Sequence, residues 1–87
     1  MQPGADQELL RKTILEIAEN QIRANDPPEV RKALERLMAD GYQREEAMKF
    51  IACVVTSEIF DVLKQQRVFY PVGYVKALNR LPTLPWE

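Results

Sequence analysis

The sequence has no histidine, and among its 87 residues it has one cysteine, one tryptophan and three glycines. Without histidine, a Cys–His or Ser–His–Asp constellation and a histidine-assisted zinc site are excluded. No glycine-rich phosphate loop is present. A single cysteine cannot form an internal disulfide, so packing and hydrogen bonds must hold the fold. We therefore predict a protein that is not an enzyme and that uses no metal and no cofactor.

Long apolar runs and a dominant charge are also missing. The longest apolar run, Phe50–Val55, has six residues, whereas a helix that spans a bilayer needs about 20. No basic-plus-apolar signal stands at the N-terminus. Twelve basic and thirteen acidic residues give a net charge of −1, which disfavours broad binding to the phosphates of nucleic acid. We expect a cytoplasmic protein whose partners are neither membranes nor nucleic acid.

Helical periodicity is what the sequence does contain. Apolar residues recur every three or four positions, which is typical of amphipathic helices. A chain of this length forms one small core. The sequence thus predicts an all-α fold, a small four-helix bundle-like domain over residues 1–87, with a long central third helix. The expected helices cover residues 6–24, 27–40, 44–66 and a fourth stretch that starts at 71 or 74 and stops at 82. Residues 1–5 should be a frayed lead, and residues 82–87 an extended C-terminal tail over the third helix.

Breaker residues mark the first two connections. Asp26 and Glu29 match a capping box in which Asp26 is the N-cap, and Pro27 suits the first helical position. Gly41 stands where a left-handed residue closes a helix, and Tyr42 can pack back on the helix it follows. Because both connections are short, sequential helices should pack as neighbours.

The stretch from Arg44 to Gln66 is the longest one without glycine or proline. Its apolar residues cover about half of the helix circumference, which suits a helix contacted by several partners. They are Ala47, Met48, Ile51, Ala52, Val54, Val55, Ile59, Val62 and Leu63. Glu58 projects from the middle of this arc, where a carboxylate must be paired, protonated or at the rim. A structural hydrogen bond is the simpler interpretation. The alternative is a small-molecule-binding protein with Glu58 as the polar anchor of an interior pocket.

A second apolar strip lies opposite this arc and consists of Phe50, Cys53 and Phe60. Cys53 is best interpreted as an inert apolar filler. Either the tail, with Trp86, folds over the strip, or another subunit does, and both hold if tails exchange between protomers. We therefore predict a non-enzymatic protein–protein interaction or regulatory module. It associates with itself as a homodimer, or with another protein, through this side of the third helix and Trp86.

Charges on the predicted second helix give only a weak indication of nucleic-acid binding. Arg31, Lys32 and Arg36 alternate with acidic residues along it. The second and third helices could be taken for a helix-turn-helix, but Glu45 and Glu46 at the start of the third helix repel phosphate. The stretch from residue 26 to residue 60 resembles small bacterial helical proteins, and this resemblance implies no activity.

Overall fold

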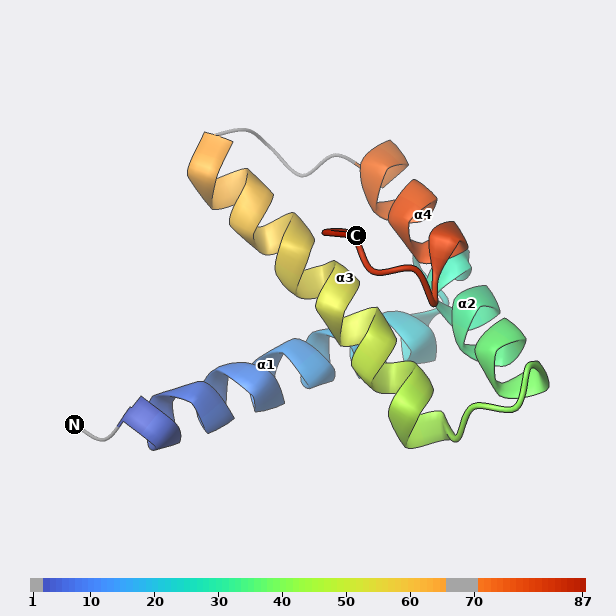
Figure 1. The fold of residues 1–87 in the computed structure, drawn as a ribbon, viewed down its shortest axis with the longest axis horizontal. Helices are drawn as coiled ribbons and strands as arrows, with labels where there is room; N and C mark the ends of the chain where they lie inside the picture. The colour runs from blue at the N-terminus through green and yellow to red at the C-terminus, as the bar shows by residue number, and fades with distance from the viewer. Residues whose placement is uncertain (1–2, 66–70) are drawn as a thin grey trace.

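Four helices build the described part of the protein, as predicted. The computed structural model describes residues 3–65 and 71–87, and within these ranges it contains no strand. The helices are α1 Pro3–Ala24, α2 Pro28–Ala39, α3 Arg44–Gln65 and α4 Pro71–Arg80 (Figure 1). Both α2 and α3 contact all three other helices. The central place predicted for the third helix is therefore shared with the second.

The first helix begins earlier than predicted. Residues 3–5, which we expected to be frayed, form the first turn of α1, and residues 1–2 lie outside the described part of the chain. Proline suits a first helical position because its φ is already helical and its missing N–H has no partner to lose. Pro3 therefore starts the helix, and Asp6 is not its N-cap.

Both α1 and α2 end at a residue with positive φ. Gly41 has φ +106°, and its N–H donates to the Met38 carbonyl at 3.1 Å while the Tyr42 N–H donates to the Leu37 carbonyl at 3.1 Å. These two bonds make the Schellman motif, and they agree with the end predicted at Gly41. Asn25, at φ +53°, ends α1 with the same pair of bonds.

The start of α2 differs from the prediction. Pro27 is the N-cap, it makes no side-chain cap hydrogen bond, and Pro28 occupies the first helical position. This shift by one residue moves the third helical position from Glu29 to Val30, which has no carboxylate, so the predicted capping box does not form. Asp26 instead belongs to the end of α1, where its N–H donates to a carbonyl of that helix.

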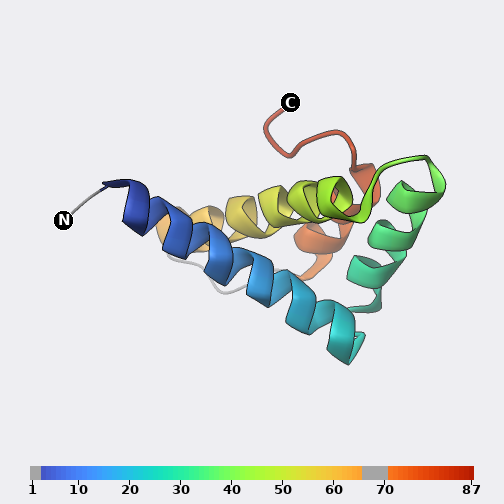
Figure 2. The ribbon, with the colours of Figure 1, turned by 90° about the horizontal axis from the view of Figure 1, so that it is seen from below.

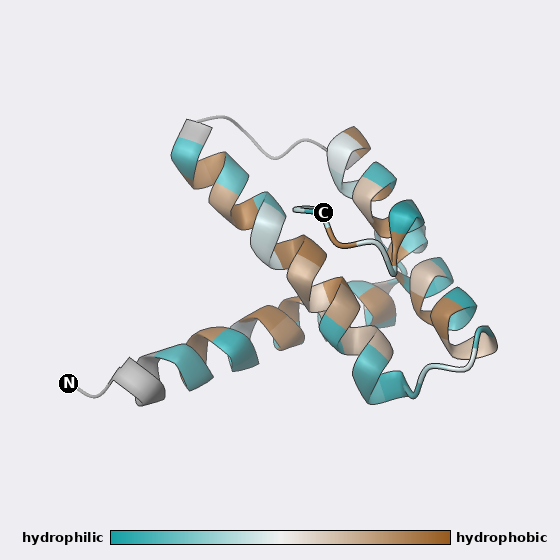
Figure 3. Ribbon diagram, in the orientation of Figure 1, coloured by the Kyte–Doolittle hydropathy of each residue, from teal (hydrophilic) through white to brown (hydrophobic). Residues whose placement is uncertain are grey.

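One apolar core lies between the four helices. Its buried members come from every helix and from the residue after α4. They are Ile14, Ala18, Ile22, Val30, Ala33, Leu34, Leu37, Ala47, Met48, Ile51, Val54, Val55, Tyr74, Leu78 and Leu81. The predicted arc on α3 is therefore buried as far as Val55, except for the half-buried Ala52. Beyond that point Ile59 is 37% exposed and Leu63 is 69% exposed, although hydrophobic residues continue along the helix (Figure 3).

Helix length explains why the arc emerges from the core. The helices α1 and α3 have 22 residues each, whereas α2 has 12 and α4 has 10. At 1.5 Å per residue, the long helices measure about 33 Å and the short ones about 15–18 Å. The long helices therefore extend beyond the short ones (Figures 1 and 2). The radius of gyration of 13.1 Å exceeds the roughly 12 Å expected for a compact domain of this length.

Two arginines of α2 bind the C-terminal ends of neighbouring helices. The Nη2 atom of Arg36 donates to the carbonyls of Leu81 at 2.7 Å and Leu78 at 3.2 Å. The Nη2 atom of Arg31 donates to the Ile22 carbonyl at 2.9 Å. Carbonyls at a helix C-terminus lack intrahelical partners and carry negative partial charge, so a guanidinium is well placed there. Arg31 and Arg36 thus connect α2 to its neighbouring helices.

The C-terminal tail turns instead of extending. The Thr83 N–H donates to the Arg80 carbonyl at 2.9 Å, and the Glu87 N–H donates to the Leu84 carbonyl at 3.1 Å. Leu84 packs half-buried against the core, and the chain must turn after α4 to bring it there. The tail consequently runs from the end of α4 back toward α3 (Figure 1).

Candidate functional site

The tail meets α3 at a groove between α3 and the N-terminal half of α1. We call this half of α1, and the C-terminal half of α3, the outer halves of the long helices. The groove has a volume of about 540 Å³. It is lined by residues from both helices and by the tail tryptophan: Gln7, Leu10, Arg11, Ile14, Leu15, Lys49, Ala52, Cys53, Thr56 and Trp86. We call it the α1–α3 groove. Its walls come from segments that are distant in sequence, so it depends on how α1 crosses α3.

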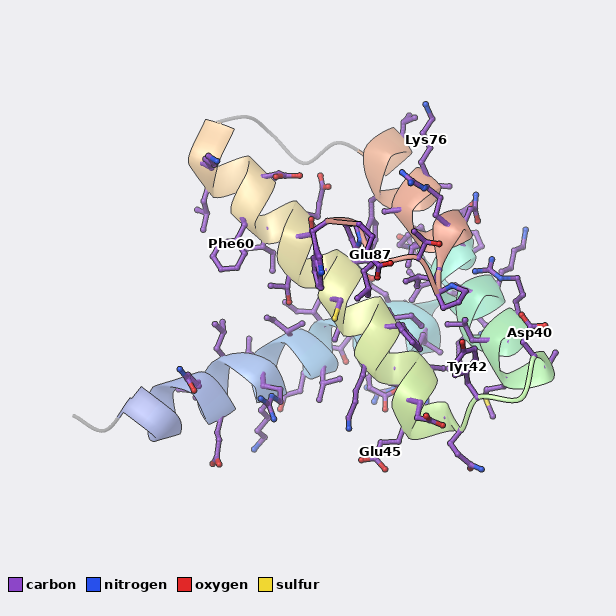
Figure 4. The ribbon with its side chains drawn as sticks, viewed as in Figure 1. Asp40, Tyr42, Glu45, Phe60, Lys76 and Glu87 are labelled. Carbon is purple, nitrogen blue, oxygen red and sulfur yellow. The ribbon has the colours of Figure 1, made fainter. Side chains whose placement is uncertain are left out.

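The three residues of the predicted second strip lie in three different environments. Phe50 is half-buried and its ring packs edge-on against Tyr42, with centroids 5.3 Å apart and an angle of 80°. Cys53 is half-buried in the α1–α3 groove. Phe60 is 58% exposed and lies one turn beyond Thr56 on the same helical face. Figure 4 shows Phe60 projecting from the outer half of α3, far from Tyr42.

The tail covers only part of this strip. Trp86 reaches the groove beside Cys53, yet its side chain is 64% exposed. Phe60 lies outside the groove lining. The two coverings that the sequence left open are therefore not equivalent, because the tail leaves Phe60 available for another molecule.

The thiol of Cys53 lies in a half-buried environment lined mostly by apolar side chains. Burial raises the pKa of Cys53, which keeps the thiol protonated at neutral pH. The thiolate is the nucleophilic form of cysteine. The environment of Cys53 therefore favours the predicted inert filler over a reactive thiol.

Glu58 lies in a second cavity, between α1, α3 and α4. This inner cleft has a volume of about 310 Å³, and its walls are mostly apolar. It is lined by Ile17, Gln21, Val55, Glu58, Ile59, Val62, Leu63 and Tyr74. Glu58 is half-buried there, which corresponds to the rim position that the sequence allowed.

Tyr74 and Gln21 add polar groups to the inner cleft that the sequence analysis did not single out. The Tyr74 hydroxyl donates to Gln21 Oε1 at 2.6 Å. Burial raises the pKa of Tyr74, the bond to Gln21 opposes this rise, and the nearby Glu58 carboxylate adds to it. Gln21 follows Ile17 by one turn, so a polar residue within the apolar face of α1 was the available signal. Its partner on α4 could not be identified without the fold.

A salt bridge joins α1 and α3 at the surface. Arg44 donates to both carboxylate oxygens of Glu19, at 2.8 Å and 3.1 Å. The hydrogen bond from Arg44 holds the pKa of Glu19 below its usual value. Both side chains are more than 40% exposed, so the pair is partly screened by solvent. Across the described residues, no group of three or more Cys, Asp or Glu side chains could hold a metal ion.

Comparisons of the chain with protein-family models, with curated proteins and with solved structures found no match. Within the described ranges, none of the helices combines the length and the hydropathy needed to cross a membrane.

Proposed function

We propose that this chain is a non-enzymatic interaction module that associates with itself through the outer side of α3. The observation that supports this is where the exposed large apolar residues lie. Most of them are on the outer halves of the two long helices and on the tail: Leu9, Leu10, Ile59, Phe60, Leu63 and Trp86. Large apolar side chains left exposed on a small domain favour an interaction surface.

The exposed aromatic residues supply enough area to matter. An aromatic side chain can bury about 150–250 Å². With 58% of Phe60 and 64% of Trp86 exposed, each leaves on the order of 100 Å² for a partner. At about 25 cal/mol per Å², covering one of them stabilises a complex by about 2.5 kcal/mol. Two such residues, with the leucines beside them, provide the apolar centre that interfaces of standard size have.

A second copy of the chain is the partner that we favour. Each copy presents two projecting helical segments, and a two-fold arrangement pairs the same surface on both copies. In such a dimer the outer half of α3 in one protomer covers the outer half of α3 or α1 in its partner. The apolar residues that the core of one protomer leaves exposed would then be covered by the other protomer, and the reverse.

Sedimentation equilibrium at tens of micromolar protein tests the self-association. We expect the wild type to be a dimer and Phe60→Glu to be a monomer, because the substitution places a charge at the centre of the interface. Met38→Glu is the matched control, since Met38 is also a partly exposed apolar residue but belongs to α2. A wild-type monomer, or equal weakening by both substitutions, contradicts the proposal.

The inner cleft supports a second candidate function, the binding of a small molecule with Glu58 as its polar anchor. The specific observation is that Glu58, Gln21 and Tyr74 share an otherwise apolar cleft. An anionic anchor favours a ligand with an amine and an apolar body. An NMR screen of amine-bearing aromatic fragments should shift cleft amide signals in the wild type and in Glu16→Gln, but not in Glu58→Gln. If no fragment shifts these signals in the wild type, this candidate fails.

A further inference from the structure

The charged side chains that line the α1–α3 groove are both cationic. Arg11 comes from α1 and Lys49 from α3, so the two cations stand on different walls of one cavity. Among the described residues neither cation takes part in an ion pair. The salt bridge between α1 and α3 joins Arg44 to Glu19 instead. Both charged groups of the groove lining are therefore positive, although the whole chain has a net charge of −1.

Acidic residues one helical turn before these cations are exposed or hydrogen-bonded elsewhere. Glu8 precedes Arg11 by one turn and is exposed, as is Glu45 before Lys49. Glu46 accepts a hydrogen bond from the Gln43 N–H at 3.1 Å. None of the three lines the groove. A bound anion would consequently meet two cations and no carboxylate on the groove wall.

Apart from Gln7 and Thr56, the rest of the lining is apolar and needs no polar partner. Leu10, Ile14, Leu15 and Ala52 form its sides together with Cys53 and the Trp86 indole. The hydroxyl of Thr56 already donates to the Ala52 carbonyl at 2.8 Å. An apolar body can thus enter without leaving the hydroxyl unpaired.

Volume helps to identify the occupant. The groove of about 540 Å³ falls within the roughly 300–1,000 Å³ of small-molecule sites. Two turns of a helix with side chains, about 10–12 Å wide and about 11 Å long, occupy roughly 1,000 Å³. Such a helix would remain about half outside, whereas a single apolar chain fits inside.

We propose that the α1–α3 groove binds a free amphiphilic anion, an apolar chain that ends in a carboxylate. The apolar chain lies between α1 and α3 beneath Trp86, and the carboxylate lies at the rim between Arg11 and Lys49. This activity goes beyond self-association: the groove shares Leu10 and Trp86 with the proposed association surface, but Phe60 is not part of its lining.

The chain carries its own reporters for this site. Trp86 is its one tryptophan and Cys53 its one cysteine, and both line the groove. Decanoate, titrated below its micelle concentration, should shift Trp86 emission to shorter wavelength. It should also slow alkylation of Cys53 by iodoacetamide several-fold. The alkylation is run at alkaline pH, because burial raises the pKa of Cys53.

Charge variants distinguish binding at this site from nonspecific hydrophobic binding. The double variant Arg11→Gln with Lys49→Gln should raise the Kd for decanoate roughly three- to ten-fold, as expected for two exposed ion pairs. Lys12→Gln is the control, since Lys12 is exposed on α1 but does not line the groove, and its Kd should equal that of the wild type. Decyltrimethylammonium, with a similar chain and the opposite charge, should bind at least ten-fold more weakly than decanoate.

Three results would overturn the proposal. The first is no response of Trp86 or Cys53 to decanoate in either the wild type or Phe60→Glu. The second is equal binding of decyltrimethylammonium. The third is a response to an acidic amphipathic peptide or to anionic vesicles but not to decanoate. If a second copy covers the groove in the wild type, decanoate should still bind to the monomeric Phe60→Glu, so this variant shows whether the dimer blocks the site. Self-association itself is judged separately by sedimentation.

Discussion

Replacing Arg36 should be among the most destabilising changes of a partly exposed residue in this chain. Its guanidinium donates to the Leu81 and Leu78 carbonyls at the end of α4. A hydrogen bond from a charged donor contributes about 1.5–3 kcal/mol, and the longer bond from the same nitrogen adds less. Leu81 is buried, so water replaces the guanidinium poorly. We expect Arg36→Met to lower the free energy of unfolding by about 2–3 kcal/mol.

This loss is large for a domain of this size. A chain of 87 residues should have a stability of about 4–13 kcal/mol. The loss corresponds to a decrease in melting temperature of about 8–20 °C. With an m-value near 1 kcal/mol/M, the urea midpoint should fall by about 2–3 M. Arg36→Lys should recover about half of the loss, because an ammonium reaches one carbonyl without the fork geometry of arginine.

Urea unfolding followed by far-UV circular dichroism at one fixed protein concentration measures the effect. The fixed concentration is needed because a dimer becomes more stable as its concentration rises. Lys32→Met is the matched control, since Lys32 is exposed on the same helix and should change stability by less than about 0.5 kcal/mol. If Arg36→Met and Lys32→Met unfold at the same urea concentration, the reasoning about Arg36 is refuted.

Three further substitutions test other features of the fold. Gly41→Ala should lower the free energy of unfolding, measured by thermal melts, by about 1–2 kcal/mol, because φ +106° strains any L side chain. Asparagine tolerates positive φ better than alanine, so an equal loss for Gly41→Asn would count against this explanation. Glu19→Gln should cost about 0.2–1 kcal/mol at neutral pH. Because Arg44 lowers the pKa of Glu19, this difference in urea midpoints should disappear as the pH falls through the lowered pKa, and a difference that persists in acid contradicts the pairing. Tyr74→Phe should cost about 0.5–1.5 kcal/mol, and a double-mutant cycle with Gln21→Ala should show coupling if the hydrogen bond is the cause.

The helices could be predicted because their signals are local. Apolar periodicity identified all four, and Gly41 marked the end of α2 by a rule that depends only on backbone conformation. The exact starts were harder. Pro27 and Pro28 both suit a first helical position, so the sequence does not distinguish a cap at Asp26 from a cap at Pro27. Pro3 also suits a first helical position, but the acidic residues that follow it led us to place the start of the helix at Asp6.

Long-range contacts could not be predicted, because their partners are far apart in the sequence. Arg36 and Leu81 are 45 residues apart, and Arg36 looked like one more charge on a surface helix. Tyr74 and Gln21 are 53 residues apart, so the polar side of the inner cleft had no local signal beyond Gln21 itself. Phe50 looked equivalent to the other members of the second strip until the fold placed Tyr42 against it.

The difference in helix length accounts for the α1–α3 groove, the inner cleft and the exposed apolar side of α3 together. Because α1 and α3 extend beyond α2 and α4, their outer halves are not covered by the short helices. The α1–α3 groove and the inner cleft both lie along these two long helices, and the exposed Phe60 lies on the outer half of α3. Shortening the long helices would make the domain more compact, but it would remove the exposed apolar residues and both cavities together. We therefore expect the function to depend on the apolar residues of α1 and α3 that the small core leaves unburied.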